Sequence, residues 1–311
     1  SITPTLHTGM AKTGSTPNFA TAPSRSFCWT PAISRRLNHH PFLDIARPYW
    51  VKLNGIGCDR YKPTMELLNA GISILGEKPI SNDIGEAKEM VALAKAKNIP
   101  YAIDHNHRFT PAARKAKEWL DEGRLGELNS INMRMWINNP NESSEHFHIR
   151  ALHPHSFDVM RFFCGKVSQV HAFFKKGAGR AIWSNVQVNL LYENGVIGHL
   201  LGSYDGGGPR TPWGLETCEI VGQEARIIIE EACEVLKFQP RHSIESETYH
   251  HLGGMKDFSE TFQSRIDQWI EDLSNGVPPD RIDGKSDDSL HAQQIIEAAI
   301  ESWSAKSVIS L

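Results

Sequence analysis

One stretch of sequence decides the fold: Gly71-Ile72-Ser73-Ile74-Leu75-Gly76-Glu77-Lys78-Pro79. It predicts a short buried strand over 72–75 that stops in Glu-Lys-Pro, because proline cannot donate to a sheet ladder. The ending places Lys78 at the carboxyl edge of a predicted parallel sheet, which is where ligands bind in open α/β sheets. Lys78 is therefore the first candidate for chemistry. From position alone, the alternative that Glu77 and Lys78 form a solvated strand end is the commoner case.

Helices and strands alternate around this stretch. Thr110-Pro111 has the pattern of a helix cap followed by proline at the first helical position. Strand, helix, strand and helix at this spacing imply a parallel sheet with crossover helices. The expected elements are a helix over 61–70, the strand over 72–75, a helix from a cap at Ser81 or Asn82 to about residue 98, a strand over 101–103 and a helix over 111–123.

After residue 127 the pattern becomes typical of an antiparallel sheet. Apolar and polar residues alternate over 131–137, which indicates a strand with one buried face. Asn194-Gly195 between two apolar runs predicts a β-hairpin. Residues 205–209 are expected to be a plain hairpin connection rather than a loop that covers a pocket. The other expected elements are a helix over 152–163, strands over 167–174, 182–192, 196–204, 215–221, 225–230 and 233–238, helices over 257–274 and 287–304, and a last strand over 307–311.

The whole-chain composition is ordinary for a globular protein. The 311 residues suffice for two domains, and the net charge of −3 gives no reason to expect nucleic acid. Five cysteines without a CxxC pair disfavour a zinc site or a disulfide scaffold and fit a reducing compartment. No apolar run approaches the ~20 residues of a membrane helix. We therefore expect a soluble, cytoplasmic protein.

The first fifty residues differ from the rest of the chain. Residues 1–50 are rich in Ser, Thr and Pro, and they show neither helical nor strand periodicity. This composition predicts a poorly ordered N-terminal segment, and a transit peptide is the less favoured alternative. The expected domains are this atypical segment, an α/β unit over 51–127 and a second unit over 128–311.

Three segments in this order resemble one family, that of glucose–fructose oxidoreductase, inositol dehydrogenase and MocA. The resemblance covers about residues 59–311, and its specificity comes from the ordered set and from the switch from α/β to antiparallel structure. The segments are Ala70-Gly71 leading into Glu77-Lys78-Pro79, then Asp104-His105-Asn106-His107-Arg108-Phe109 followed by Gly123-Arg124-Leu125-Gly126-Glu127, and then His155-Ser156-Phe157-Asp158 followed by Phe163-Cys164-Gly165.

The resemblance implies a fold, a cofactor and a reaction. The fold class would be α/β plus α+β, with an incomplete Rossmann-like parallel sheet followed by a large, mostly antiparallel open sheet. The cofactor would be NAD or NADP, and the substrate a CH–OH group of a sugar, polyol or inositol-like compound. The C-terminal sheet would also form a homo-oligomer interface. The implied cofactor contacts are Glu77, Lys78, Pro79, Asn106 and Arg108, and the implied substrate contacts are Lys78, Arg150, His153 and His155.

The residues that the resemblance singles out make chemical sense. His155 has the near-neutral pKa that suits a general acid or base, and it would move the hydroxyl proton. The Lys78 ammonium would polarise the reacting oxygen. Asp158 lies three residues after His155 on a predicted helix, so the two share a face and Asp158 is the third candidate catalytic residue. The alternative is that Asp158 bonds the backbone or an arginine such as Arg161.

The sequence departs from the family pattern at two places. The GxGxxG turn that seats a dinucleotide is missing, and its only candidate, Gly55-Ile56-Gly57, lacks the third glycine and is expected to be a weak cofactor contact. Two interpretations are open: a truncated gene product, or an inactive relative that acts as a binding or assembly protein. Ala151 also stands where many members have an aspartate four residues before the histidine, and either His153 or Asp158 would replace it.

Three other groups of residues have alternative interpretations. Four histidines (His146, His148, His153 and His155) lie within ten residues, but they lack the acids or cysteines in a fixed pattern that a metal site needs, so no metal is expected. His105-Asn106-His107 superficially resembles a metal-nuclease triplet, although its place after a strand fits the family loop better. Trp183 and Trp213 are candidates for sugar stacking, and core or interface packing is an equal alternative.

Overall fold

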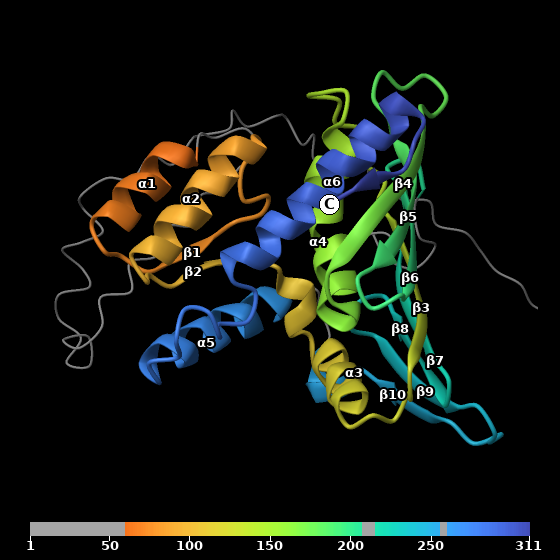
Figure 1. The fold of residues 1–311 in the computed structure, drawn as a ribbon. Coiled ribbons are helices and arrows are strands. Elements are labelled where there is room, and N and C mark those ends of the chain that lie inside the picture. Colours follow the sequence, from red (N-terminus) through yellow and green to blue (C-terminus); the bar gives the residue numbers. More distant parts are fainter. Residues whose placement is uncertain (1–59, 207–214, 256–259) are drawn as a thin grey trace, which may run out of the picture.

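The computed structural model describes residues 60–206, 215–255 and 260–311. The predictions made for 1–50, for Gly55-Ile56-Gly57 and for Trp213 lie outside these residues. Figure 1 shows a small α/β unit beside a tall sheet, with helices between the two. This arrangement confirms the expected fold class, a small parallel sheet followed by a large, mostly antiparallel one.

The small unit holds two parallel strands, β1 (Ile74–Gly76) and β2 (Tyr101–Ile103). Two helices, α1 (Tyr61–Asn69) and α2 (Ile84–Ala96), pack together beside them and form an apolar core with the strands. The cap of α2 is Asp83, whose carboxylate accepts from the Glu86 amide, so the prediction of Ser81 or Asn82 was wrong by one or two residues. The strand predicted over 72–75 lies at β1.

Two short helices follow β2 and lead to the second unit. The first is η1 (Asn106–Phe109), a 3-10 turn, and the second is α3 (Pro111–Asp121). The Thr110 side chain accepts from the Ala113 amide and Pro111 is the first helical residue, which confirms the predicted cap.

Within the described residues, the large sheet has nine strands in the order β10-β9-β8-β7-β3-β6-β5-β4-β11. All neighbouring pairs are antiparallel except β3 with β6, which is parallel. The sequence prediction missed β10. The strands are β3 (Leu128–Trp136), β4 (Val167–Lys175), β5 (Asn185–Tyr192), β6 (Ile197–Ser203), β7 (Leu215–Gly222), β8 (Ala225–Glu230), β9 (Val235–Pro240), β10 (Glu247–His250) and β11 (Ile309–Ser310).

The strand order corrects one prediction about the loop that begins at Asp205. Because β3 lies between β6 and β7, these two consecutive strands are not neighbours in the sheet, so the predicted plain hairpin is wrong. Residues 207–209 of the predicted connection lie outside the described residues. The Asn194-Gly195 hairpin between β5 and β6 is confirmed. Its Gly195 has a φ of 87°, a conformation that favours glycine.

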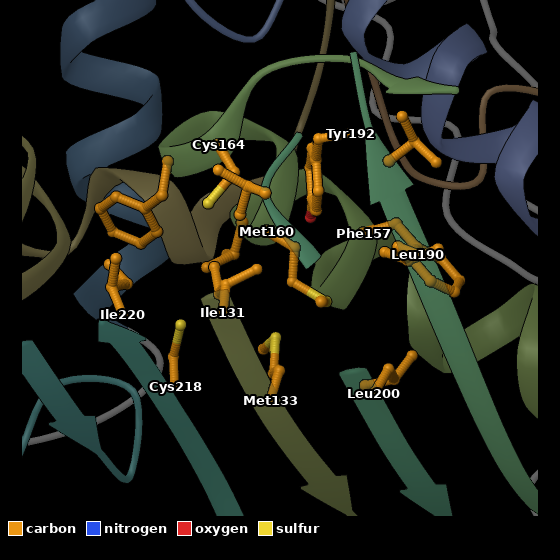
Figure 2. Close-up of a cluster of buried hydrophobic side chains, with 14 of the residues drawn as sticks. Ile131, Met133, Phe157, Met160, Cys164, Leu190, Tyr192, Leu200, Cys218 and Ile220 are labelled. Atoms are coloured by element: carbon orange, nitrogen blue, oxygen red, sulfur yellow. The ribbon is translucent and has the colours of Figure 1, made fainter. Parts of the chain in front are cut away.

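One face of the large sheet is covered by helices. They are α4 (Phe147–Cys164) and α6 (Ser286–Ala305), which pack on each other and on the sheet. Figure 2 shows the apolar core under α4, where Phe157 and Met160 meet Ile131, Met133 and Leu200 of the strands. The helix predicted over 152–163 begins five residues earlier, at Phe147, and Pro154 is tolerated inside it.

One helix of the second half packs against the first unit. The helix α5 (Glu260–Ser274) places Trp269 in a cluster with Leu75 of β1 and Ala102 of β2. A β-bridge between Ala102 and Lys285 adds a backbone contact to the same unit. The two units predicted from the sequence are therefore joined by residues that come late in the chain, which fixes the edge of the small sheet relative to α4.

Candidate active site

The candidate site lies where β1 and β2 end, at the carboxyl edge of the parallel pair (Figure 1). Glu77, Lys78 and Pro79 follow β1, and the Lys78–Pro79 peptide bond is cis. The Lys78 Nζ donates a hydrogen bond of 2.9 Å to the backbone carbonyl of Ala151 in α4. Because Ala151 and His155 are four residues apart on this helix, the bond places Lys78 about one helical turn from His155.

The protonation of Lys78 is shifted by its surroundings. Burial lowers the pKa of Lys78 to about 8, because desolvation disfavours the ammonium, and Arg60 acts in the same direction while Glu77 opposes it. Its hydrogen-bond acceptor on α4 is a neutral carbonyl rather than a carboxylate. Lys78 remains mainly cationic at pH 7, so it can polarise an oxygen, and it becomes mainly neutral above about pH 8.

His155 is an uncharged imidazole at neutral pH. Its pKa lies well below the usual value, first because of burial and then because Lys78 and His107 repel the imidazolium. The residue is 7% exposed, and its Nδ1 is a buried atom without a hydrogen-bond partner. A neutral imidazole can accept a proton, which is the role that general-base catalysis requires.

A second imidazole stacks on His155. The ring centroids of His107 and His155 are 4.3 Å apart, and the planes are tilted by 34°. His107 belongs to η1 and is itself buried. Its Nδ1 lies 2.8 Å and 3.0 Å from the two carboxylate oxygens of Glu216 on β7. Glu216 was not predicted as a site residue, because nothing local in the sequence links it to a histidine 109 residues away.

Asp158 does not orient His155, which corrects the sequence prediction. Its carboxylate forms a two-pronged ion pair with Arg108, through Nε at 2.7 Å and through Nη2. The Arg108 Nη1 also bonds Asp283 at 2.7 Å and Asp288 at 3.0 Å. Helical spacing correctly predicted that Asp158 lies on the same buried face of α4 as His155. Arg108 of η1 also lies against that face and pairs with the Asp158 carboxylate.

Arg108 is therefore a structural hub rather than a free cofactor contact. It is 1% exposed, and its three carboxylate partners lie on α4, on the loop before α6 and on α6 itself. Burial of the pair would be costly if either partner were missing. The hub holds η1 against α4 and so sets how His107 meets His155. The alternative partner that the sequence suggested for Asp158, Arg161, pairs with Asp288 instead.

The remaining predicted site residues have partners of their own. The side chain of His153 is fully buried, with Nδ1 2.9 Å from the Ser156 hydroxyl and Nε2 3.0 Å from Nε2 of His148, and its role as a substrate contact stays a prediction. Arg150 forms an ion pair with Glu297 at the surface.

A third histidine at this edge was not predicted as a site residue. His105 Nε2 lies 2.9 Å from the Ser289 hydroxyl and 4.0 Å from Asp158. Burial lowers its pKa to about 4, although Asp158 opposes the shift. Among the described residues, no group of three or more His, Cys, Asp or Glu side chains is arranged to hold a metal ion. Within the same residues, no helix combines the length and apolarity needed to cross a bilayer.

Two family profiles match successive segments of the chain. Residues 50–105 match the profile described as oxidoreductase family, NAD-binding Rossmann fold, and residues 113–228 match that of the GFO/IDH/MocA C-terminal domain. Together they cover more than half of the chain. The fold is thus that of a Rossmann unit followed by an open sheet, and the chain belongs to the GFO/IDH/MocA family of oxidoreductases.

Individual relatives match over limited segments. Levoglucosan dehydrogenase of Pseudarthrobacter phenanthrenivorans is 31% identical over 115 residues, which are 33% of this chain and 30% of that protein. D-apiose dehydrogenase of Paraburkholderia graminis is 24% identical over 166 residues, which are 51% of this chain and 44% of that protein. The matched segments thus span less than half the length of these curated relatives.

Solved structures show the same fold. A levoglucosan dehydrogenase in complex with NADH and levoglucosan superposes with a TM-score of 0.74 at 20% identity, covering 84% of this chain and 79% of that one. An inositol dehydrogenase homologue from Azotobacter vinelandii, complexed with NADH and myo-inositol, gives 0.72 at 13% identity, covering 84% and 78%.

The polar groups at this edge fit a polar ligand such as a nicotinamide. The Asn106 side chain donates to the Thr261 hydroxyl at 2.6 Å, while its Oδ1 is buried and lacks a partner. The Nδ1 of His155 is likewise buried and lacks a hydrogen-bond partner. Buried polar atoms without partners are rare and point to an unseen water or ligand. Lys78, Asn106 and His155 are the described residues that would hold the nicotinamide end, where the cofactor gains or loses a hydride.

Proposed function

We propose that this chain is an NAD-dependent oxidoreductase that acts on a CH–OH group of a sugar or polyol. The observation that carries the proposal is the hydrogen bond from Lys78 to the Ala151 carbonyl, which places Lys78 about one helical turn from His155. A cation and a neutral imidazole at the ligand edge of a parallel sheet are what alcohol oxidation needs from the protein. The family and the cofactors named for its solved members support NAD.

The two residues would divide the work. Lys78 binds the substrate oxygen and stabilises the negative charge that develops on it. His155 takes the hydroxyl proton as the carbon–oxygen double bond forms and the carbon gives up its hydride. In the reverse direction His155 returns the proton and Lys78 polarises the carbonyl. We also propose that residues 51–127 form the cofactor unit and 128–311 the substrate unit.

The test uses the purified full chain. NADH and NADPH are titrated by fluorescence, and levoglucosan, myo-inositol and L-sorbose are screened as substrates, because solved relatives were crystallised with these compounds. His155→Asn should lower kcat/KM by roughly 10²–10⁴-fold with little change in NADH affinity, since the imidazole acts on the proton. Lys78→Met should raise KM for the substrate and lower kcat as well.

Two outcomes would contradict the proposal. One is a folded protein that binds neither cofactor up to millimolar concentration, which would favour the alternative of a non-catalytic binding or assembly protein. The other is turnover that survives His155→Asn unchanged. His250→Asn serves as the matched control, because His250 is an exposed histidine on β10, away from the sheet edge that carries Lys78.

The outer face of the large sheet is proposed as a homo-oligomer contact. Phe173 on β4 and Ile197 on β6 are 52% and 60% exposed, although both lie on regular strands. Apolar side chains that stand out from a sheet are commonly covered by a partner. Light scattering should detect an oligomer in solution, and Phe173→Asp with Ile197→Asp should dissociate it. A monomeric wild-type chain would overturn this assignment.

A further inference from the structure

The guanidinium of Arg265 is a buried cation that donates no hydrogen bond within the described residues. Arg265 lies on α5 and is 0% exposed. Its Nε, Nη1 and Nη2 are all buried atoms without a hydrogen-bond partner. Burial lowers the pKa of Arg265 to about 10, while Asp104 and Asp283 oppose the shift, so the group stays charged at neutral pH. A buried charge without a partner is costly, so this position calls for a compensating acceptor.

The neighbouring carboxylates do not supply that acceptor. Asp283 is shared by two other arginines, since its Oδ1 accepts from Arg108 and its Oδ2 from Arg114. Asp104, which follows β2, attracts the guanidinium of Arg265 through space but accepts no hydrogen bond from it. The nearby Arg108 guanidinium adds a repelling positive charge. The carboxylates around Arg265 therefore attract its charge without satisfying its N–H groups.

Two aromatic rings contact the guanidinium. The Cζ of Arg265 lies 4.5 Å from the ring centroid of Phe109 and 5.8 Å from that of Trp269. Cation–π contacts stabilise the charge, but an aromatic ring offers no lone pair to the N–H groups. An arginine presents these N–H groups in a planar fork that suits an anion. The acceptor that fits this position is therefore one that carries negative charge.

The chain leaves room for a small anion beside Nη2 of Arg265. Gly284 lies in the loop before α6 and has a φ of 68°. A methyl group on its Cα would lie 3.6 Å from Nη2 of Arg265 and 3.5 Å from the Phe109 ring, which are ordinary van der Waals distances. The space between Gly284 and the guanidinium thus takes a group the size of a methyl, and a chloride ion has about that size.

We propose that Arg265 binds a small inorganic anion of the chloride class at the junction of the two units. The anion accepts from the guanidinium fork in the space beside Gly284. The Gly284 carbonyl accepts from the Ile103 amide of β2 at 3.1 Å, and Trp269 of α5 packs on Leu75 of β1. The bound anion therefore helps to hold α5 and the loop before α6 against the small sheet. The proposal does not depend on the oxidoreductase function.

The test compares thermal unfolding of the full chain in sodium chloride and in sodium gluconate. Equal ionic strength removes screening from the comparison, and gluconate is too large for a methyl-sized space. Chloride at a few times its dissociation constant should raise the Tm of the wild-type chain by about 2–4 °C over gluconate, because it binds only the folded state. The response should saturate. Arg265→Met should lose it, since methionine keeps much of the bulk without the charge.

A second pair of variants keeps Arg265 in place. Gly284→Asp puts a carboxylate beside Nη2, and aspartate tolerates a positive φ better than most residues do. This chain should fold, and its Tm should no longer respond to chloride, because the new carboxylate takes the place of the anion. Gly284→Asn is the matched neutral variant. It should fill the same space and have the lower Tm of the two, since an amide leaves the guanidinium charge uncompensated.

Chloride binding is also observed directly, through the broadening of the chloride NMR line. The line should be broader with the wild-type chain than with Arg265→Met. Arg226→Met is the surface control, because Arg226 is an exposed arginine that pairs with Glu219, and it should keep both the broadening and the Tm response. A wild-type Tm that is indifferent to chloride would overturn the inference, since water would then satisfy the guanidinium. A chloride response that persists in Gly284→Asp or in folded Arg265→Met would overturn it as well.

Discussion

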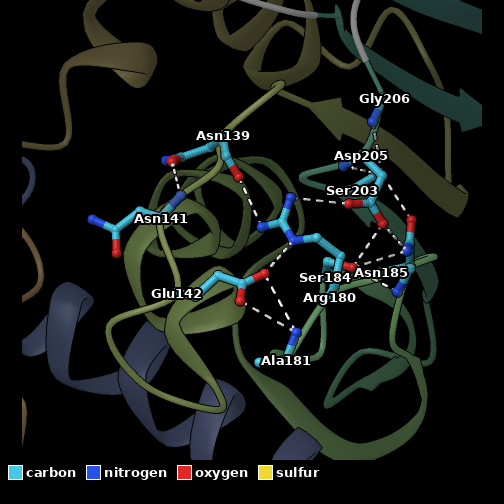
Figure 3. Close-up of polar contacts among 11 residues, drawn as sticks. Asn139, Asn141, Glu142, Arg180, Ala181, Ser184, Asn185, Ser203, Asp205 and Gly206 are labelled. Atoms are coloured by element: carbon cyan, nitrogen blue, oxygen red, sulfur yellow. Dashed lines mark hydrogen bonds and ion pairs between the residues drawn. The ribbon is translucent and has the colours of Figure 1, made fainter.

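The polar cluster around Lys78 and His155 differs from the polar network around Arg180 and Asp205 in how its groups are paired. Figure 3 shows the second network, in which Arg180 reaches Glu142, the Asn139 carbonyl and Asp205. Asp205 in turn accepts from Ser184 at 2.7 Å and from Asn185 at 2.6 Å. These bonds tie together the loops that follow β3, precede β5 and follow β6.

The cluster at the small sheet edge is less completely paired and more deeply buried. Nδ1 of His105, Nδ1 of His155 and Oδ1 of Asn106 are buried atoms without hydrogen-bond partners in the described part of the chain. Leaving such atoms unpaired costs about 1–3 kcal/mol each. The comparison teaches that paired polar groups hold loops, whereas retained unpaired groups mark a place where a ligand or a proton is expected.

The largest expected effect is at the hub that supports the first cluster. Arg108→Ala should lower the free energy of unfolding by about 3–5 kcal/mol, because it leaves the buried Asp158 carboxylate without its partner. Urea denaturation of the full chain measures the change. Arg226→Ala is the matched control, since this exposed arginine on β8 pairs with Glu219 and should cost less than about 1 kcal/mol. Equal losses in the two variants would contradict the distinction.

Acid should destabilise the protein next, through buried histidines: His105 belongs to the first cluster, and His148 lies near Arg180 and Asp205 of the second network. The folded-state pKa is lowered to about 4 for His105 and to about 3 for His148, whereas the unfolded chain titrates near 6.5. The unfolded state therefore binds more protons below pH 6.5, and stability falls as the pH drops from 6.5 towards 4. Each such histidine contributes a slope of up to about 1.4 kcal/mol per pH unit.

Urea denaturation at pH 7.5 and at pH 5 measures this loss. His105→Gln should reduce the difference between the two pH values, because one buried titrating group is removed. His250→Gln should not, since His250 lies exposed on β10. The Asp158 carboxyl, whose pKa is lowered by Arg108 despite its burial, loses its contribution only below about pH 4 and stays outside this window. Equal stability at both pH values would refute the expectation.

The smallest effect is expected in the second network. Ser184→Ala removes one hydroxyl that donates to Asp205, which still accepts from Asn185 and Arg180. The same hydroxyl accepts from the Gly177 amide at 2.9 Å, so two hydrogen bonds are lost. The free energy of unfolding should fall by about 1–2 kcal/mol, since each such bond is worth about 1 kcal/mol net. A loss above about 3 kcal/mol, measured in the same denaturation series, would mean that this network is as critical to the fold as the Arg108 hub.

Local pattern was enough for much of the fold. The strand at Tyr101–Ile103, the Thr110 cap and the Asn194-Gly195 hairpin each depend on neighbours in sequence, and the structure has them where they were expected. The loop after Asp205 was misjudged, because strand order depends on which distant strand inserts between two neighbours. Local periodicity carries no information on that choice.

The candidate site also has one part that local sequence predicts and another that only the tertiary structure sets. The sequence by itself determined that Lys78 follows a strand at the carboxyl edge of a parallel sheet and that His155 belongs to a helix, since proline placement and helical periodicity are local. Only the tertiary structure decided the partners: Asp158 goes to Arg108, and Glu216 reaches His107. The physical reason is that a carboxylate pairs with whichever hydrogen-bond donor folding brings within a few ångströms, and that donor is 50 residues away in one case and 109 in the other.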